Sequence, residues 1–476
     1  MKKKHVSLFC NCLAGIISSL STSLLSTGSL SISLGPVDFG PVRFGALDLQ
    51  LSNTAHAQIL ESSEPSATEA LAAANTLSQR AARLYQQGRY AEAIPLMEQA
   101  LTLEESVFGD SHPEVANTLS NLALLYQEQG QYSEAQPYSE RALTIRVETL
   151  GETHLDTAYS LDSLAGIYKN LGNYESALLL YEQAIAIYEL DYQRNTRTNY
   201  LGIATSLNNL AGLYKIQGNY IAARARYERM LSIYESALGP DHLSVATGLN
   251  NLADLDRLEG DYETALVRYK RALGIREAQL DARHPSIATS LNNLAALYQT
   301  QENYSRAQSL YERALNIRIA ALGNQHPEVA ASLNNLAELH RLQEEYGVAL
   351  RLHERALAIW QETRGASHPD VATSLNNLAE VYRGLEKYLK ALELHEQSLA
   401  IRESALGAGH PAVGSSLNNI AGLYQAMGDF ESAGLFYERA LAIMQVALGE
   451  SHPDVVTIAE NLTSLRENVP VETEEF

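Results

Sequence analysis

Histidine is the first residue type in this chain whose spacing suggests chemistry. Six histidines follow one another at intervals of 42 residues: His242, His284, His326, His368, His410 and His452. Zinc needs imidazole nitrogens at about 2.0–2.1 Å, whereas two helix layers in each interval, about 8–10 Å between axes, would hold successive histidines far apart. We therefore expect no shared metal ion. Because prolines such as Pro285 and Pro327 follow most of them, we predict that these histidines pack in loops or cap helices.

Motifs for catalysis or cofactor binding do not accompany the histidines. The sequence contains no P-loop, no G-x-S-x-G nucleophile elbow and no H-E-x-x-H zinc motif. Cys10 and Cys12 are the only two cysteines, so nothing after residue 12 can form a disulfide or a thiolate metal site. Acids and bases recur with the same interval, as they do on solvated helix faces. The sequence predicts neither an enzyme nor a cofactor.

Asparagine pairs recur at the same interval and offer a second kind of chemistry. The pairs are Asn208/Asn209, Asn250/Asn251, Asn292/Asn293, Asn334/Asn335, Asn376/Asn377 and Asn418/Asn419, and an earlier copy has Asp162/Ser163 in their place. An amide side chain has two hydrogens to donate and an oxygen to accept, which suits it to holding an extended peptide by its backbone. The same amides could instead bridge neighbouring copies as a ladder, and one member of each pair could serve each purpose.

Charged residues follow the asparagines along the chain. Three acid–base pairs stand three residues apart: Asp254/Arg257, Glu338/Arg341 and Glu380/Arg383. On a helix such pairs neutralise one another for only ~0.2–0.5 kcal/mol each. Lys169 and Lys215 have Gly166 and Gly212 where the acid would stand, so we predict an unpaired basic seat that favours an acidic residue or a free carboxylate. The alternative is that both lysines are solvated and have no role.

One copy of the 42-residue unit, Thr289–Ala330, shows which secondary-structure elements must position these residues. Apolar and small residues recur there with helical spacing in two runs: Leu291, Leu294, Ala295 and Tyr298, then Tyr304, Ala307, Tyr311, Ala314 and Leu315. Between the runs stands a polar joint, Gln301–Asn303, where other copies have a glycine that can end a helix in the left-handed conformation. Pro327 suits a first helical position after an exit at Gly323. Each copy therefore reads helix, turn, helix, turn.

Alanines at Ala295, Ala307 and Ala314 would let two helices approach closely beneath the larger leucines and tyrosines. This arrangement resembles the tetratricopeptide repeat, and the phrase LNNLA…Y…YERALxIRExxLGxxHPxVA resembles the longer form found in kinesin light chains. The resemblance covers roughly Glu114–Leu462. It implies an all-α, right-handed superhelical solenoid. It also implies that the asparagine pairs, with Lys169, Lys215, Arg257, Arg341 and Arg383, line a concave groove that takes a partner protein.

The chain holds about nine such repeats. The first, Leu71–Gly109, lacks the asparagine pair, as a terminal repeat often departs from the pattern. Four extra residues fall within Tyr192–Leu201, which we expect to be a surface loop that either tolerates the insertion or lies near a binding face. After the ninth repeat, Asp454–Asn468 is predicted to be a capping helix. The array then spans residues 70–468, between a linker at 58–69 and an acidic tail at 469–476.

The N-terminal residues suggest export. Lysines at positions 2 to 4 precede an apolar, serine-rich stretch, and Ala55-His56-Ala57 fits a cleavage site after Ala57. Removal of residues 1–57, with four basic and two acidic side chains, would change the net charge from −21 to −23 and leave no membrane span. A cytoplasmic protein with an N-terminal extension, or an uncleaved anchor, is the alternative. The acidic balance argues against a nucleic-acid partner.

These features together predict a non-enzymatic scaffold that binds an extended segment of another protein. Two other functions fit the same sequence: a subunit that recruits substrate for an enzyme encoded elsewhere, and a structural spacer in the cell envelope. The resemblance does not extend to a motor subunit, because the residues before the repeats show no heptad pattern.

Overall fold

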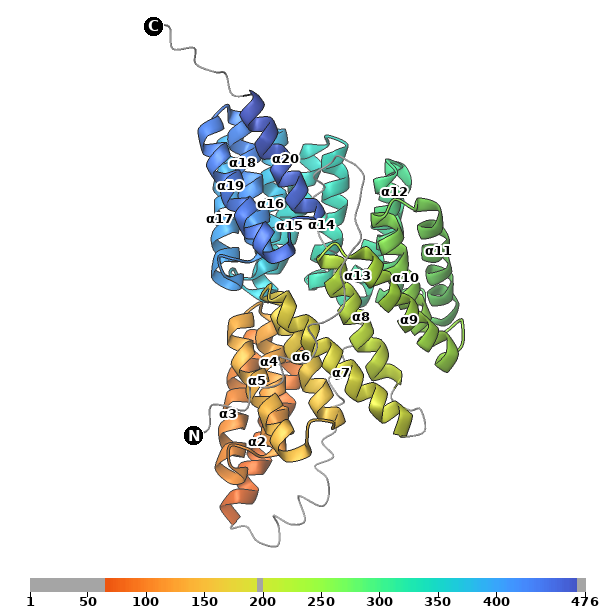
Figure 1. Ribbon diagram of the computed structural model, residues 1–476, viewed down its shortest axis with the longest axis vertical. Helices are drawn as coiled ribbons and strands as arrows, with labels where there is room; N and C mark the ends of the chain where they lie inside the picture. Colours follow the sequence, from red (N-terminus) through yellow and green to blue (C-terminus); the bar gives the residue numbers. More distant parts are fainter. Residues whose placement is uncertain (1–64, 195–199, 469–476) are drawn as a thin grey trace. The chain divides into compact units, whose positions relative to one another are not determined.

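The computed structural model describes residues 65–194 and 200–468. Within those ranges all regular structure is helical, and nineteen helices follow one another as hairpins (Figure 1). Consecutive pairs pack against one another through all nine repeats, and one further helix packs against the ninth pair. The predicted all-α solenoid of nine repeats and a final helix is confirmed.

The bounds of the helices show how regular the repeats are. Repeats 1 to 3 comprise α2 (Pro65–Gln86) with α3 (Tyr90–Phe108), α4 (Pro113–Glu128) with α5 (Tyr132–Leu150), and α6 (Leu155–Asn170) with α7 (Tyr174–Arg194). Repeats 4 to 6 comprise α8 (Tyr200–Ile216) with α9 (Tyr220–Leu238), α10 (Leu243–Leu258) with α11 (Tyr262–Gln279), and α12 (Pro285–Thr300) with α13 (Tyr304–Leu322). Repeats 7 to 9 comprise α14 (Pro327–Leu342) with α15 (Tyr346–Arg364), α16 (Pro369–Gly384) with α17 (Tyr388–Leu406), and α18 (Pro411–Met427) with α19 (Phe430–Leu448). Helix α20 (Pro453–Asn468) stands alone at the end.

The recurring histidines begin the first helix of most repeats. In α14, His326 Nδ1 accepts a hydrogen bond from the backbone N–H of Glu328 at 3.2 Å, and Pro327 occupies the first helical position. This bond satisfies one of the N–H groups that a helix start leaves without a partner. The same cap is made by His112, His154, His242, His284, His368, His410 and His452. The predicted capping role is confirmed, and it fixes the proton of each neutral imidazole on Nε2.

Small residues let the two helices of a repeat pack closely. Ala295 of α12 and Ala307 and Ala314 of α13 are completely buried, as predicted. Tyr311 is buried, and so are the tyrosines at the equivalent position of other repeats: Tyr181, Tyr227, Tyr269 and Tyr437. Tyr304, at the start of α13, is half-buried. Tyr220, Tyr262 and Tyr346 are half-buried in the same way, because they stand at the first residue of their helices.

Two boundaries differ from the sequence prediction. Helix α2 begins at Pro65, so the second half of the expected linker is helical. The predicted loop at Tyr192–Leu201 is shorter than expected, because α7 continues to Arg194 and α8 begins at Tyr200. Residues 195–199, the proposed export signal at 1–57 and the acidic tail at 469–476 lie outside the described residues. None of the helices that the structure describes is both long and apolar enough to span a membrane.

Helix α20 covers the last repeat. Its Val455, Ile458, Leu462 and Leu465 are buried against α18 and α19. Its polar residues Glu460, Thr463, Arg466 and Glu467 are exposed. The separation of apolar and polar residues on opposite sides of the helix is what a terminal cap of a repeat array requires.

Candidate functional site

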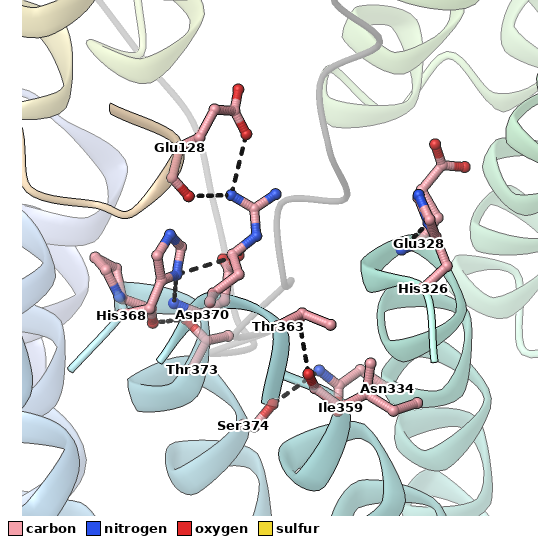
Figure 2. A network of polar contacts seen from close by, with 12 residues as sticks. Glu128, His326, Glu328, Asn334, Ile359, Thr363, His368, Asp370, Thr373 and Ser374 are labelled. Carbon is pink, nitrogen blue, oxygen red and sulfur yellow. Dashed lines mark hydrogen bonds and ion pairs between the residues drawn. The ribbon is translucent and has the colours of Figure 1, made fainter. Parts of the chain in front are cut away.

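The first asparagine of each pair joins neighbouring repeats. Asn250 Nδ2 of repeat 5 donates a hydrogen bond to Ser290 Oγ of repeat 6 at 3.1 Å. The same bond recurs from Asn334 to Ser374 at 3.2 Å (Figure 2) and from Asn376 to Ser416 at 3.4 Å. In repeats 5 to 8 the first asparagine exposes only 3 to 7 % of its surface. These side chains form a ladder between repeats.

The second asparagine of each pair lies in a different environment. It is half-exposed in all six repeats that have a pair: Asn209, Asn251, Asn293, Asn335, Asn377 and Asn419. Asn251 Nδ2 donates to Asn208 Oδ1 of the preceding repeat at 2.6 Å, and Asn335 makes the same bond to Asn292 at 3.0 Å. We call these six second asparagines the amide face. They have the solvent access that ligand binding needs, which the buried first asparagines lack.

A buried arginine reinforces the ladder from the second helix of the repeat. Arg276 of α11, 2 % exposed, donates to Ser290 Oγ at 2.9 Å and to Thr247 Oγ1 at 3.0 Å. Ser290 Oγ therefore accepts hydrogen bonds from both Asn250 and Arg276. Side chains from three helices of two repeats meet at this one hydroxyl group. Arg146, Arg318 and Arg402 repeat this contact with Ser160, Ser332 and Ser416. Burial lowers the pKa of Arg402 to about 10, as expected of a guanidinium held mainly by neutral partners.

Sequence reasoning missed these arginines. A signal was present, because Arg276, Arg318 and Arg402 share one position of the 42-residue repeat, directly after an apolar isoleucine. Their hydroxyl partners, such as Ser290 and Ser416, recur as well. An arginine that recurs next to a core position is a candidate for a buried hydrogen-bonding role.

Lys215 has a partner, so the predicted unpaired basic seat is wrong. Its Nζ lies 2.7 Å from Asp254 Oδ2, and Asp254 Oδ1 accepts a hydrogen bond from Arg257 at 2.7 Å. Burial alone would raise the pKa of Asp254, but Lys215 and Arg257 lower it to about 2. The acid comes from the next repeat, 39 residues later, and not from three residues earlier on the same helix. For Lys169, burial and the nearby charge of Lys215 lower the pKa to about 8.

The other predicted ion pairs are present. Arg341 and Glu338 are 2.7 Å apart, and Arg383 lies 2.8 Å from Glu380. The carboxylate of Glu380 is also 3.3 Å from the buried His395, whose Nδ1 lies 2.8 Å from Asn376 Oδ1. These charged groups lie along the amide face in successive repeats and form ion pairs with one another.

His353 occupies the equivalent place in repeat 7. Its Nδ1 lies 2.9 Å from Asn334 Oδ1, so the imidazole must donate that hydrogen. Burial, with a smaller contribution from Arg341, lowers the pKa of His353 to about 3. In other repeats the position holds a tyrosine such as Tyr311, which donates to Gln299. The two histidines tie the first asparagine to the second helix and add no exposed group to the amide face.

The structure thus separates the predicted site residues into two groups. The first asparagines of repeats 5 to 8 serve the inter-repeat ladder, and Asn208 and Asn418 are half-buried members of the same series. The second asparagines, together with Arg341 and Arg383, reach the surface of the first helices. Arg257 is only 8 % exposed and is held by Asp254.

Comparison with known proteins agrees with this architecture. The tetratricopeptide repeat family matches residues 72–146, 114–189, 202–278, 286–362, 328–404, 370–445 and 412–467. No curated protein sequence matches the chain.

Similar solved structures include BtubC (BKLC) from P. vanneervenii, with 27 % identity over 50 % of this chain and 94 % of that chain and a TM-score of 0.40. A putative kinesin light chain from Podospora anserina has 29 % identity over 43 % of this chain and 97 % of its own, with a TM-score of 0.37. A tetratricopeptide repeat protein from Parabacteroides merdae has 17 % identity over 65 % and 98 %, with a TM-score of 0.42. The chain belongs to the tetratricopeptide repeat family.

Proposed function

We propose that this protein is a non-enzymatic scaffold that holds an extended segment of a partner protein along the amide face. The observation that supports the proposal is that the second asparagines have hydrogen-bonding groups that other described residues do not use. Asn251 uses one amide hydrogen for Asn208, and its other hydrogen and its oxygen make no hydrogen bond to another described residue. One donor and one acceptor at each repeat is what a peptide backbone needs.

The surroundings of the amide face support a protein ligand over other classes. Asp254, Glu338 and Glu380 are each paired with an arginine beside the asparagines, so the face has mixed charge. The chain as a whole carries a net charge of −21, which opposes the phosphate contacts that dominate nucleic-acid binding. Tetratricopeptide repeats in general mediate contacts between proteins, which is consistent with this assignment.

The test uses a library of unstructured peptides displayed on phage, selected against the full chain, followed by calorimetry with the enriched peptides. Asn293→Ala combined with Asn377→Ala should weaken binding about tenfold or more, because each removes a hydrogen bond to the peptide worth ~0.5–1.5 kcal/mol. The melting temperature should change little, because these two amides, unlike Asn251 and Asn335, make no hydrogen bond to another described residue. The matched variant Asn250→Ala with Asn334→Ala removes two ladder residues and should lower the melting temperature. If no peptide is enriched, or if enriched peptides bind the first variant as tightly as the wild type, the amide face is not a peptide site.

We also propose that residues 1–57 direct export and are removed. The support is the basic start, the apolar stretch and the Ala55-His56-Ala57 pattern, together with the absence of cysteine after Cys12. N-terminal sequencing of the protein from its native cells should begin at Gln58. Recovery of an intact N-terminus from the cytoplasmic fraction would contradict the proposal.

A further inference from the structure

Repeats that are far apart in the sequence are in contact. The turns between the two helices of repeats 2 to 4 lie against the N-terminal ends of α16, α18 and α20. Arg364, at the end of α15, donates a hydrogen bond to the backbone oxygen of Glu128 at 2.7 Å and lies 3.3 Å from its carboxylate, across 236 residues. Figure 2 shows Glu128 beside His368 and Asp370, which begin α16. A contact of this range is not part of the packing between consecutive repeats.

Three such contacts follow one another in order. A methyl group placed on Gly130, in the turn of repeat 2, would lie 2.5 Å from Pro369 Cδ at the start of repeat 8. A methyl group on Gly172 of repeat 3 would lie 3.0 Å from His410 Cδ2 at the start of repeat 9. In the third contact, Gly218 of repeat 4 meets His452 and Pro453 at the start of α20, both at 3.1 Å. Each turn therefore meets the helix start that comes six repeats later.

His452 uses both of its ring nitrogens in the third contact. His452 Nδ1 accepts the capping hydrogen bond from Asp454 at 3.1 Å, so its proton is on Nε2. Nε2 lies 2.9 Å from the carbonyl oxygen of Ile216, at the end of α8. One imidazole thus caps its own helix and donates to the end of a helix that precedes it by 236 residues.

None of the turns that make these contacts has a side chain at its left-handed position. All nine turns between the two helices of a repeat hold a left-handed residue at the same position, and Glu302, Glu344 and Glu386 occupy it in repeats 6 to 8 with φ near 60°. In repeats 2 to 4, where a helix start lies against the turn, the residue is glycine. A turn that tolerates glutamate elsewhere needs glycine there because a side chain would strike proline or histidine.

We propose that these contacts form a latch, comprising Glu128, Gly130, Gly172, Gly218, Arg364, His368, His410 and His452, that opens and closes while every repeat stays folded. Repeats 5 and 6 and the part of repeat 7 before Arg364 connect the two sides of the latch, so a closed latch holds their mutual angles fixed. Opening breaks the polar contacts, the contacts of the three glycines with proline and histidine, and the packing of the half-buried Leu448 of α19 against the core of repeats 3 to 5. It leaves the buried alanine and leucine layers within and between consecutive repeats unchanged. The latch is therefore a conformational device that is independent of the peptide site.

The chain supplies a closely matched pair of variants for the test. Gly130→Glu, Gly172→Glu and Gly218→Glu together place a side chain in each latch contact. Gly88→Glu, Gly260→Glu and Gly428→Glu make the same substitution at left-handed turns with nothing within 4 Å of the added carbon. Both triple variants carry the same charge and the same backbone strain, so they differ only in the latch.

The measurement is the distance between nitroxide labels at Ser133→Cys in α5 and Leu389→Cys in α17, two exposed positions on helices that touch each other. The full chain is used with Cys10→Ser and Cys12→Ser, so only the two new cysteines are labelled. The wild-type background and the control triple should give one short, narrow distance. The latch triple should give longer and broader distances with an unchanged helical circular dichroism spectrum.

Two results would overturn the proposal: an unchanged distance distribution in the latch triple, or an equal change in the control triple. Should the latch triple lose its helical signal, Arg364→Gln decides the matter, because it removes the contact to Glu128 without altering a turn. That variant should populate the long distances in a measurable fraction of molecules. An Arg364→Gln protein with the wild-type distribution would show that the latch does not open on its own.

Discussion

Asp162 of α6 accepts a hydrogen bond from Ser206 Oγ of α8 at 2.6 Å, in the place where later repeats have the first asparagine bonded to a serine. Burial raises the pKa of Asp162 to about 7, although Ser206 lowers it in part. The folded state therefore binds the proton more tightly than the unfolded state, whose carboxyl titrates near 3.8. Stability contributed by this group is lost as the pH rises from about 4 to 7.

Asp162→Asn should stabilise the protein at pH 8 and change little at pH 4. An amide in this place can donate to Ser206 as Asn250 donates to Ser290, and it carries no charge to bury. We expect a gain of about 1–3 kcal/mol at pH 8, the usual cost of an uncompensated buried polar group. Chemical denaturation at both pH values measures it, with the exposed Asp241→Asn as control. A gain that is equal at pH 4 and pH 8 would rule out titration of Asp162 as the cause.

Lys215→Glu should destabilise the fold. The new carboxylate would face Asp254, which at present lies 2.7 Å from the lysine and is 26 % exposed. The loss of the ion pair and the repulsion between two acids should cost about 1–3 kcal/mol, whereas Lys270→Glu on an exposed face should stay within about 0.5 kcal/mol. Thermal and urea unfolding of the two variants give the comparison. Adding Asp254→Asn to Lys215→Glu should restore part of the loss; without such a rescue, another cause must be sought.

Arg276→Met should loosen the boundary between repeats 5 and 6. It removes the donor shared by Ser290 and Thr247 while keeping the length of the side chain. The loss of the hydrogen bonds to Ser290, which keeps Asn250 as a partner, and to the half-buried Thr247 should cost about 1–3 kcal/mol. Hydrogen exchange should rise in α10 and α12, and a double-mutant cycle with Ser290→Ala should show coupling between the two residues. The exposed Arg271→Met serves as control, and independent effects of Arg276 and Ser290 would contradict the shared role.

Much of the fold could be predicted because the repeat presents each local signal many times. Helix starts at His-Pro, left-handed turns such as the one at Glu302, and alanines between helices depend on neighbours within a few residues, and all of them are confirmed. The prediction about Lys215 was wrong because its acid stands one repeat away, 39 residues along the chain. Periodicity shows that repeats stack but not which side chains meet across the boundary.

The latch was even less accessible to sequence reasoning. The Arg364 contact to Glu128 spans 236 residues and depends on how six repeats accumulate small angles between helices. No sequence pattern near Glu128 indicates that Arg364 is its partner. The sequence shows glycine at the turn position of repeats 1 to 5 and 9 and glutamate in repeats 6 to 8, but the need for glycine in repeat 2 is apparent only from the contact between Pro369 and Gly130.

The last prediction concerns the response of the latch to acid. The closed latch buries His368 and lowers its pKa to about 3, and burial with the charge of Arg402 lowers the pKa of His410 to about 4. An open latch exposes both imidazoles and should return them toward 6.5, so the open state binds protons more readily and acid below pH 6.5 favours it. Asp370 acts in the opposite direction, because burial raises its pKa in spite of Arg364. We expect the two histidines together to outweigh this single carboxyl group.

The labelled protein should therefore move from short to long distances between pH 6.5 and pH 4, while the circular dichroism spectrum keeps its helical form. His368→Asn with His410→Asn retains a side chain that can cap a helix but does not titrate, so this variant should stay closed to a lower pH. His242→Asn with His284→Asn changes two capping histidines outside the latch and should leave the transition in place. A transition that is identical in all three proteins would assign the acid response to carboxylates such as Glu128, whose ion pair with Arg364 is lost on protonation.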